Sequence, residues 1–111
     1  MDENAGMIVV YTTLPSESDA RKIGQELVEE KLAACVNIFP GMVSVYRWQG
    51  NIETGNETVL LVKTRKDLSK QVLEALAARH PYSVPALVVF EPQYVAGPYL
   101  DWLREQTMTQ R

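Results

Sequence analysis

Hydrophobic residues in this chain follow two patterns, short continuous runs and longer segments with helical spacing. The runs predict strands at residues 7–13, 32–48, 57–64 and 86–90. Apolar residues three and four positions apart predict amphipathic helices at 16–31 and 67–80, and Pro98 at a favourable first helical position predicts a short third helix near the end of the chain. The predicted order is therefore β-α-β-β-α-β followed by an additional helix.

A weak internal repeat supports this order, because Val9–Thr13 resembles Leu61–Arg65 in sequence. Two βαβ halves of this kind make an α+β fold, the ferredoxin-like split βαβ, in which two helices cover one face of an antiparallel sheet. Ser16, three residues before Asp19, predicts the N-cap of the first helix, and Asp67 predicts that of the second. Pro81 disfavours helical geometry at His80 and predicts the end of the second helix there.

The middle of the chain predicts an unusually long hairpin that turns near Gly50-Asn51. Each arm of about 14 residues would span roughly 45 Å, whereas a compact domain of this size has a radius of gyration of about 13 Å. Three of the predicted strands are also apolar on both faces, and the two helices can cover only one. We therefore expect an oligomer; the alternative is that the third helix and the hairpin fold back over the second face.

The composition is that of one small globular domain. With 111 residues, a net charge of −3 and no cluster of basic residues, the chain predicts a single domain at 7–106, with a flexible tail at 1–6 and a frayed end at 107–111, and a protein that binds neither nucleic acid nor membrane. The single cysteine favours a reducing compartment, and the acidic start does not resemble a secretion signal, so we expect a cytoplasmic protein.

Few residues offer metal or catalytic chemistry. His80, the one histidine, is interpreted either as a helix-end residue favoured by the helix dipole or as a metal ligand. Cys35 is interpreted either as a small buried hydrophobe or as a soft ligand for copper, together with His80 from a distant segment. No spacing typical of a closed zinc site, nucleophile elbow or phosphate-binding loop is present, so we do not expect an enzyme.

The hairpin carries the most informative aromatic residues. Tyr46 and Trp48 share one of its faces, and Val43 and Val45 lie on the other, which suits anchors of a subunit interface. A platform on which a ligand stacks is the alternative for the aromatic pair. Further along, Glu57 and Lys63 share a face at opposite ends of a strand, as expected for a polar rim.

Five motifs, in order along the chain, together resemble the CutA divalent-cation-tolerance family, and the match extends from about Met7 to Leu103. They are Lys31–Cys35, Tyr46–Gly50, Leu61–Thr64, His80-Pro81-Tyr82 with Val84-Pro85, and Tyr99–Leu103. The resemblance implies a ferredoxin-like homotrimer in the cytoplasm, without enzymatic activity, linked to tolerance of copper and other divalent cations.

The resemblance also implies where metal and small ligands would bind. Thr12 and Arg79 stand where a bacterial relative has proposed copper ligands, which leaves His80; since arginine is no ligand for copper, any binding is expected to be weak. The family also resembles the PII signalling proteins, whose clefts between subunits bind metabolites. That alternative predicts a small anionic ligand with contacts from four residues, Trp48, Glu57, Lys63 and Tyr82.

Overall fold

The computed structural model describes residues 6–108 and confirms the expected α+β fold. Its four strands form one antiparallel sheet in the order β2-β3-β1-β4, the ferredoxin-like arrangement. The strands are β1 (Met7–Leu14), β2 (Cys35–Trp48), β3 (Asn51–Arg65) and β4 (Val88–Phe90). Residues 1–5 of the predicted tail and residues 109–111 of the predicted frayed end lie outside the described residues. Thr107, which the sequence placed in that end, is buried and bonded to Arg65.

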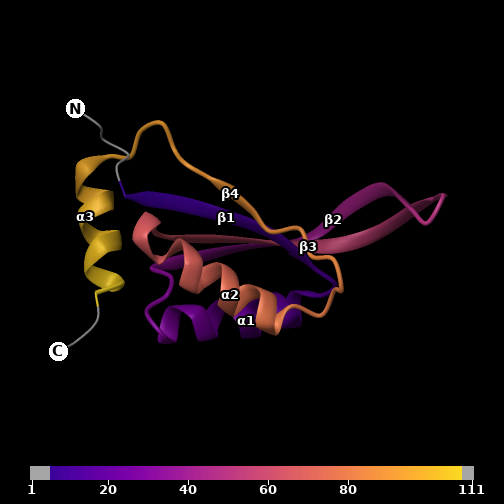
Figure 1. Ribbon diagram of the computed structural model, residues 1–111, viewed down its shortest axis with the longest axis horizontal. Coiled ribbons are helices and arrows are strands. Elements are labelled where there is room, and N and C mark those ends of the chain that lie inside the picture. The colour runs from indigo at the N-terminus through magenta and orange to yellow at the C-terminus, as the bar shows by residue number, and fades with distance from the viewer. Residues whose placement is uncertain (1–5, 109–111) are drawn as a thin grey trace.

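Helices α1 (Glu17–Glu29) and α2 (Ser69–Arg79) lie together on one face of the sheet (Figure 1). Alternate residues of β1 and β3 point toward them and form the main core with apolar residues of both helices, among them Ile8, Val10, Leu27, Leu60, Val62, Val72 and Leu76. This side of the sheet is closed, as the alternation of strand side chains requires.

The opposite face of the sheet is covered at one end only. Helix α3 (Gly97–Gln106) packs there with residues such as Met7 and Ala34. Beyond it, the side chains of Phe39 and Phe90 are 54% and 55% exposed. Within the described chain, neither α3 nor the hairpin folds over this part of the sheet, so the alternative of a self-covered second face holds only for the end under α3.

The predicted hairpin is present and extends well past the helices (Figure 1). The molecule is 47 Å long and 22 Å thick, with a radius of gyration of 15.0 Å, larger than that of a compact domain of this length. The turn lies at Gln49-Gly50, one residue before the predicted position, with φ angles of +51° and +84°. Two successive positive φ angles in a two-residue turn match the right-handed twist of the flanking strands.

Most of the predicted boundaries hold. The backbone N–H of Asp19 donates to the Ser16 hydroxyl at 3.1 Å, which confirms that N-cap, and α2 ends at Arg79, just before His80. The Asp67 cap is wrong: its carboxylate pairs with Arg65, and a 3₁₀ turn at Lys66–Leu68 precedes the helix. The last strand is also shorter than the predicted 86–90.

Candidate functional site

A cleft of about 580 Å³ lies where the hairpin, the end of β1 and the loop after α2 meet. We call it the Glu57 cleft. Its lining is formed by Thr13, Tyr46, Trp48, Gly55, Asn56, Glu57, Pro81, Tyr82, Ser83, Val84 and Ala86. Three of the four residues predicted to contact a ligand, Trp48, Glu57 and Tyr82, therefore come together in one chain.

The Glu57 carboxylate is held by hydrogen bonds from both sides of the cleft. Its Oε1 accepts from the Ser44 hydroxyl at 2.6 Å, and its Oε2 accepts from the Tyr82 hydroxyl at 2.8 Å. Ser44 lies on β2, diagonally opposite Glu57 on the same face of the hairpin, whereas Tyr82 comes from the loop after α2. The bond from Ser44 joins the two strands of the hairpin, and the bond from Tyr82 connects the hairpin to the body of the domain.

These hydrogen bonds favour the ionised form of the Glu57 carboxyl. Burial alone would raise the pKa of the Glu57 carboxyl. Hydrogen bonds from Ser44, Tyr82 and Thr13, together with the charge of His80 when the imidazole is protonated, lower the pKa below 4.5. Burial, together with the bond to Glu57, raises the pKa of Tyr82 to about 12. At neutral pH the cleft thus contains a carboxylate that accepts hydrogen bonds and a phenol that donates one.

The His80 ring lies 5.0 Å from the Tyr82 ring, measured between centroids, and hydrogen bonds at both ring nitrogens fix its orientation. Nδ1 accepts from the backbone N–H of Tyr82 at 3.1 Å, which assigns the proton to Nε2. Nε2 lies 2.9 Å from the Thr13 carbonyl, to which it donates, and 3.0 Å from the Thr12 hydroxyl. Burial lowers the pKa of His80, outweighing the Thr13 carbonyl and Glu57, which raise it, so the neutral imidazole is favoured.

The residues at the expected metal positions do not fit a metal centre within one chain. The lone pair of His80 Nδ1 is used by Tyr82, and Arg79 forms ion pairs with Glu26 and Glu30 at 2.8 and 2.6 Å. Cys35 on β2 and Thr12 on β1 lie on opposite sides of β3. Their partners on β3, Lys63 and Leu60, are three residues apart, about 10 Å along the strand, so Cys35 is not close to Thr12. In the region 6–108, no three His, Cys, Asp or Glu side chains are grouped to hold a metal ion.

The other predicted residues lie outside the Glu57 cleft. Lys63 is six residues along β3 from Glu57, about 20 Å away, and its Nζ lies 5.9 Å from the centre of the Tyr99 ring. Val43 and Val45 are exposed on the other face of the hairpin, as predicted from their parity.

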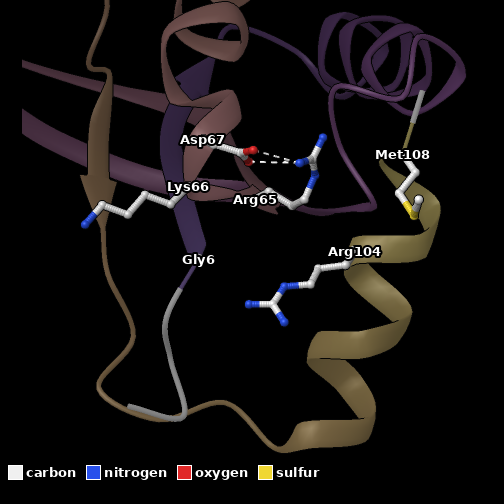
Figure 2. A pocket seen from close by; sticks show the side chains of 6 residues that line it. All are labelled: Gly6, Arg65, Lys66, Asp67, Arg104 and Met108. Carbon is white, nitrogen blue, oxygen red and sulfur yellow. Dashed lines mark hydrogen bonds and ion pairs between the residues drawn. The ribbon is translucent and has the colours of Figure 1, made fainter. Parts of the chain in front are cut away.

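A second pocket, of about 500 Å³, lies near α3 (Figure 2). It contains Arg65 and Arg104, but the Arg65 guanidinium is held by Asp67 and by Thr107. Lys66 forms an ion pair with Glu91, and in Figure 2 its side chain extends away from the two arginines. Arg65 thus connects β3 to the residue that follows α3, and we do not assign this pocket a ligand.

The hydrogen-bond partners of Glu57 were not all identified from the sequence. Ser44 has the same strand parity as Tyr46 and Trp48, so it could be paired with Glu57 once the register of the hairpin is known. Thr13, whose side chain also contacts Glu57, gave no signal, because it belongs to an ordinary apolar strand.

Fold and cleft together define a ferredoxin-like α+β domain with a protruding hairpin and a carboxylate at its base. The model of the CutA1 divalent ion tolerance protein family matches residues 8–106, and the chain belongs to this family. The chain is 50% identical over 99 residues to the divalent-cation tolerance protein CutA of Thermus thermophilus, covering 89% of this chain and 96% of that one.

Other relatives are longer. A chloroplastic CutA protein of Arabidopsis thaliana is 41% identical over 90% of this chain, but the match spans only 55% of the plant protein. Among solved structures, CutA1 of Ehrlichia chaffeensis superposes with a TM-score of 0.91 at 33% identity, covering 95% of this chain and 98% of the other. The divalent cation tolerance protein of Thermus thermophilus superposes with a TM-score of 0.87 at 49% identity, covering 92% of this chain and 99% of the other. None of the described helices is long and apolar enough to cross a membrane.

Proposed function

We propose that this chain forms a cytoplasmic homotrimer that takes part in the response to divalent cations such as copper and does not act as an enzyme. The observation that carries the assembly is the open face of the sheet. Phe39, Val88 and Phe90 are exposed there, next to the partly exposed Tyr11 and Leu61. An apolar surface on a central sheet favours burial against another copy of the chain.

The hairpin offers the second contact region. It extends past the helices, and Val43, Val45, Tyr46 and Trp48 are all exposed on it. Exposed aromatic and branched residues on a protruding ribbon are typical anchors of subunit interfaces. These four residues are proposed to contact the neighbouring copies.

The absence of catalysis is proposed from the ionisable groups of the cleft. Efficient acid–base catalysis needs a group with a pKa near the working pH. The pKa of Tyr82 is about 12, and those of Glu57 and His80 are lowered. None of the three is adjusted toward neutrality, which favours a binding role.

Direct copper binding is proposed to be weak. A metal at His80 would displace the hydrogen bond from Tyr82 N–H or the one to Thr13, and the neighbouring Thr12 and Arg79 supply no good ligand. The cytoplasmic location is supported by the single free cysteine. The PII-like alternative gains no support from the relatives found. Its predicted ligand contacts Trp48, Glu57 and Tyr82 do line the Glu57 cleft.

Light scattering coupled to size exclusion tests the assembly. The mass is expected to be about three times that of the 12.5 kDa chain, and Phe39→Lys on the open face is expected to reduce it. Val28→Lys is the matched control, because Val28 lies on the outer side of α1 and is also partly exposed. A monomeric wild-type protein would overturn the proposed assembly, and an unchanged trimer in Phe39→Lys would move the interface elsewhere.

A further inference from the structure

The Glu57 cleft has an unusual balance of charge. Among the described residues that line it, Glu57 is the one that is charged at neutral pH, and no lysine or arginine contributes to the lining. Asp19 also lies close enough to act electrostatically on Tyr82. The field inside the cleft of one chain is therefore negative, which favours cations and disfavours anions.

The carboxylate retains capacity for a ligand. Each carboxylate oxygen can accept about two hydrogen bonds. Ser44, Tyr82 and Thr13 together donate three to Glu57, which leaves room for about one more. These same bonds fix the orientation of the carboxylate. A preorganised and ionised acceptor of this kind suits an N–H donor or a positively charged methylammonium group.

Three aromatic side chains line the same cleft, Tyr46 and Trp48 from the hairpin and Tyr82 from the loop after α2. Aromatic faces attract cations through their quadrupole, most strongly when the site is partly desolvated. Trp48 is 45% exposed, so its ring is accessible in the described chain. The volume of about 580 Å³ lies within the range of small-molecule sites.

We propose that the Glu57 cleft binds a small organic cation, with the ammonium group at the Glu57 carboxylate and its apolar part against Tyr46, Trp48 and Tyr82. This goes beyond the proposed role in cation tolerance. All the lining residues belong to one chain, and because Tyr46 and Trp48 are also proposed contacts of the neighbouring copies, the cation would bind beside that interface. It also reverses the charge of the ligand expected from the sequence, since Lys63 lies against Tyr99 and not in this cleft.

Isothermal titration of the assembled wild-type protein with three probes tests the proposal. Choline carries the cation, 3,3-dimethylbutan-1-ol is its uncharged isostere, and propionate is a small anion. Saturable binding is expected for choline, with affinity at least tenfold weaker for the isostere and none for propionate. Equal binding of choline and the isostere would overturn the proposal in favour of an apolar pocket, and a failure of choline to bind would also overturn it.

Variants locate the site. Glu57→Gln keeps the shape and an acceptor oxygen but removes the charge, and it is expected to weaken choline binding at least tenfold. Glu74→Gln on α2 is the control, because Glu74 is exposed and lies outside the lining, and it is expected to leave the affinity within twofold. An affinity unchanged in Glu57→Gln would refute the assignment of the site.

Lys63→Gln separates the proposal from an anion site completed by a neighbouring copy. Choline affinity is expected to stay within twofold of wild type in this variant, since Lys63 is outside the cleft of its own chain. Binding of propionate that is lost in Lys63→Gln would assign the cleft to anions and overturn the proposal. Light scattering on each variant shows whether the assembly is intact, so a failure of assembly and a failure of cation binding are distinguishable.

Discussion

The Tyr82 hydroxyl donates a hydrogen bond of 2.8 Å to the Glu57 carboxylate and joins the loop after α2 to the hairpin. Tyr82→Phe removes this bond while keeping the ring. Because the acceptor is charged and partly buried, we expect the free energy of unfolding to fall by about 1–2 kcal/mol, as measured by denaturant titration. The pKa of Glu57 is expected to rise toward its ordinary value, because one hydrogen bond that lowers it is lost.

Tyr94→Phe is the control for this experiment, since Tyr94 is an exposed tyrosine outside the cleft. Its free energy of unfolding is expected to stay within about 0.5 kcal/mol of wild type. A Glu57 carboxyl that titrates at the same pH in wild type and Tyr82→Phe, measured by carbon-detected NMR, would contradict the assigned role of the bond.

His80 makes stability depend on pH. Its pKa is lowered in the folded protein from an ordinary value of 6.5, so the unfolded chain binds more protons just below that pH. The stabilisation from neutral His80 is complete above pH 6.5 and is lost as the pH falls through the folded pKa. His80→Gln is expected to flatten this part of the stability profile.

Proton NMR provides the direct measurement, because His80 is the only histidine and its ring signals need no assignment by mutation. The imidazole is expected to titrate below pH 6.5 in the folded protein. A titration above that value would contradict the hydrogen-bond pattern at Nδ1. Glu57 is the charged partner that raises the pKa of His80. The pKa of Glu57 is itself lowered below 4.5, so its carboxylate is ionised just below pH 6.5.

The strands and helices were predictable because they rest on periodic patterns, and errors occurred where a local competitor exists. The Ser16 cap was predicted correctly, because the Ser16 hydroxyl accepts from the backbone N–H of Asp19 and no other described side chain competes for it. Asp67 has the same cap chemistry, but Arg65, two residues away, takes its carboxylate with two hydrogen bonds. An ion pair of this geometry outweighs a single bond to a backbone N–H.

The candidate site was predictable only in part, because it is assembled from segments far apart in the chain. Strand parity placed Glu57 and Lys63 on one face at opposite ends of a strand, and their spacing of six residues, about 20 Å, is too long for both to line one cleft of a single chain. The contact between Tyr82 and Glu57 depends on the path of an irregular loop, which no period describes. The aromatic residues of the hairpin were nevertheless found from sequence, since alternation fixes their face.

The turn of the hairpin offers a test of local geometry. Gln49 has a φ of +51°, which is unfavourable for its side chain, and Gly50 has a φ of +84°. Gln49→Asn is expected to stabilise the protein by about 0.5 kcal/mol, and Gly50→Ala to destabilise it by about 1 kcal/mol. Thermal unfolding at constant protein concentration measures both; a stabilising Gly50→Ala would contradict the turn geometry.

Copper titration tests the metal expectation at His80. The imidazole nitrogens are both engaged and Arg79 is held by Glu26 and Glu30, so isothermal titration is expected to show no tight site. His80→Ala is expected to give the same heats as wild type. A site of micromolar affinity that disappears in His80→Ala would show that copper displaces these hydrogen bonds and would refute the poor fit argued above.

Gly24 in α1 lies so close to β2 that a Cβ would approach Cγ2 of Val36 to 2.8 Å. Alanine favours a helix over glycine by about 1 kcal/mol, but this contact is shorter than side chains tolerate, so Gly24→Ala is expected to destabilise by about 1–3 kcal/mol. In Gly24→Ala/Val36→Ala the clash is relieved, and the loss is expected to be at least 1 kcal/mol smaller than the sum of the single variants.

Gly97→Ala in α3, where nothing lies within 4 Å of the added atom, is the control and is expected to be neutral or stabilising. Chemical denaturation of the four variants measures the coupling, and strictly additive losses would contradict the close approach of α1 to β2.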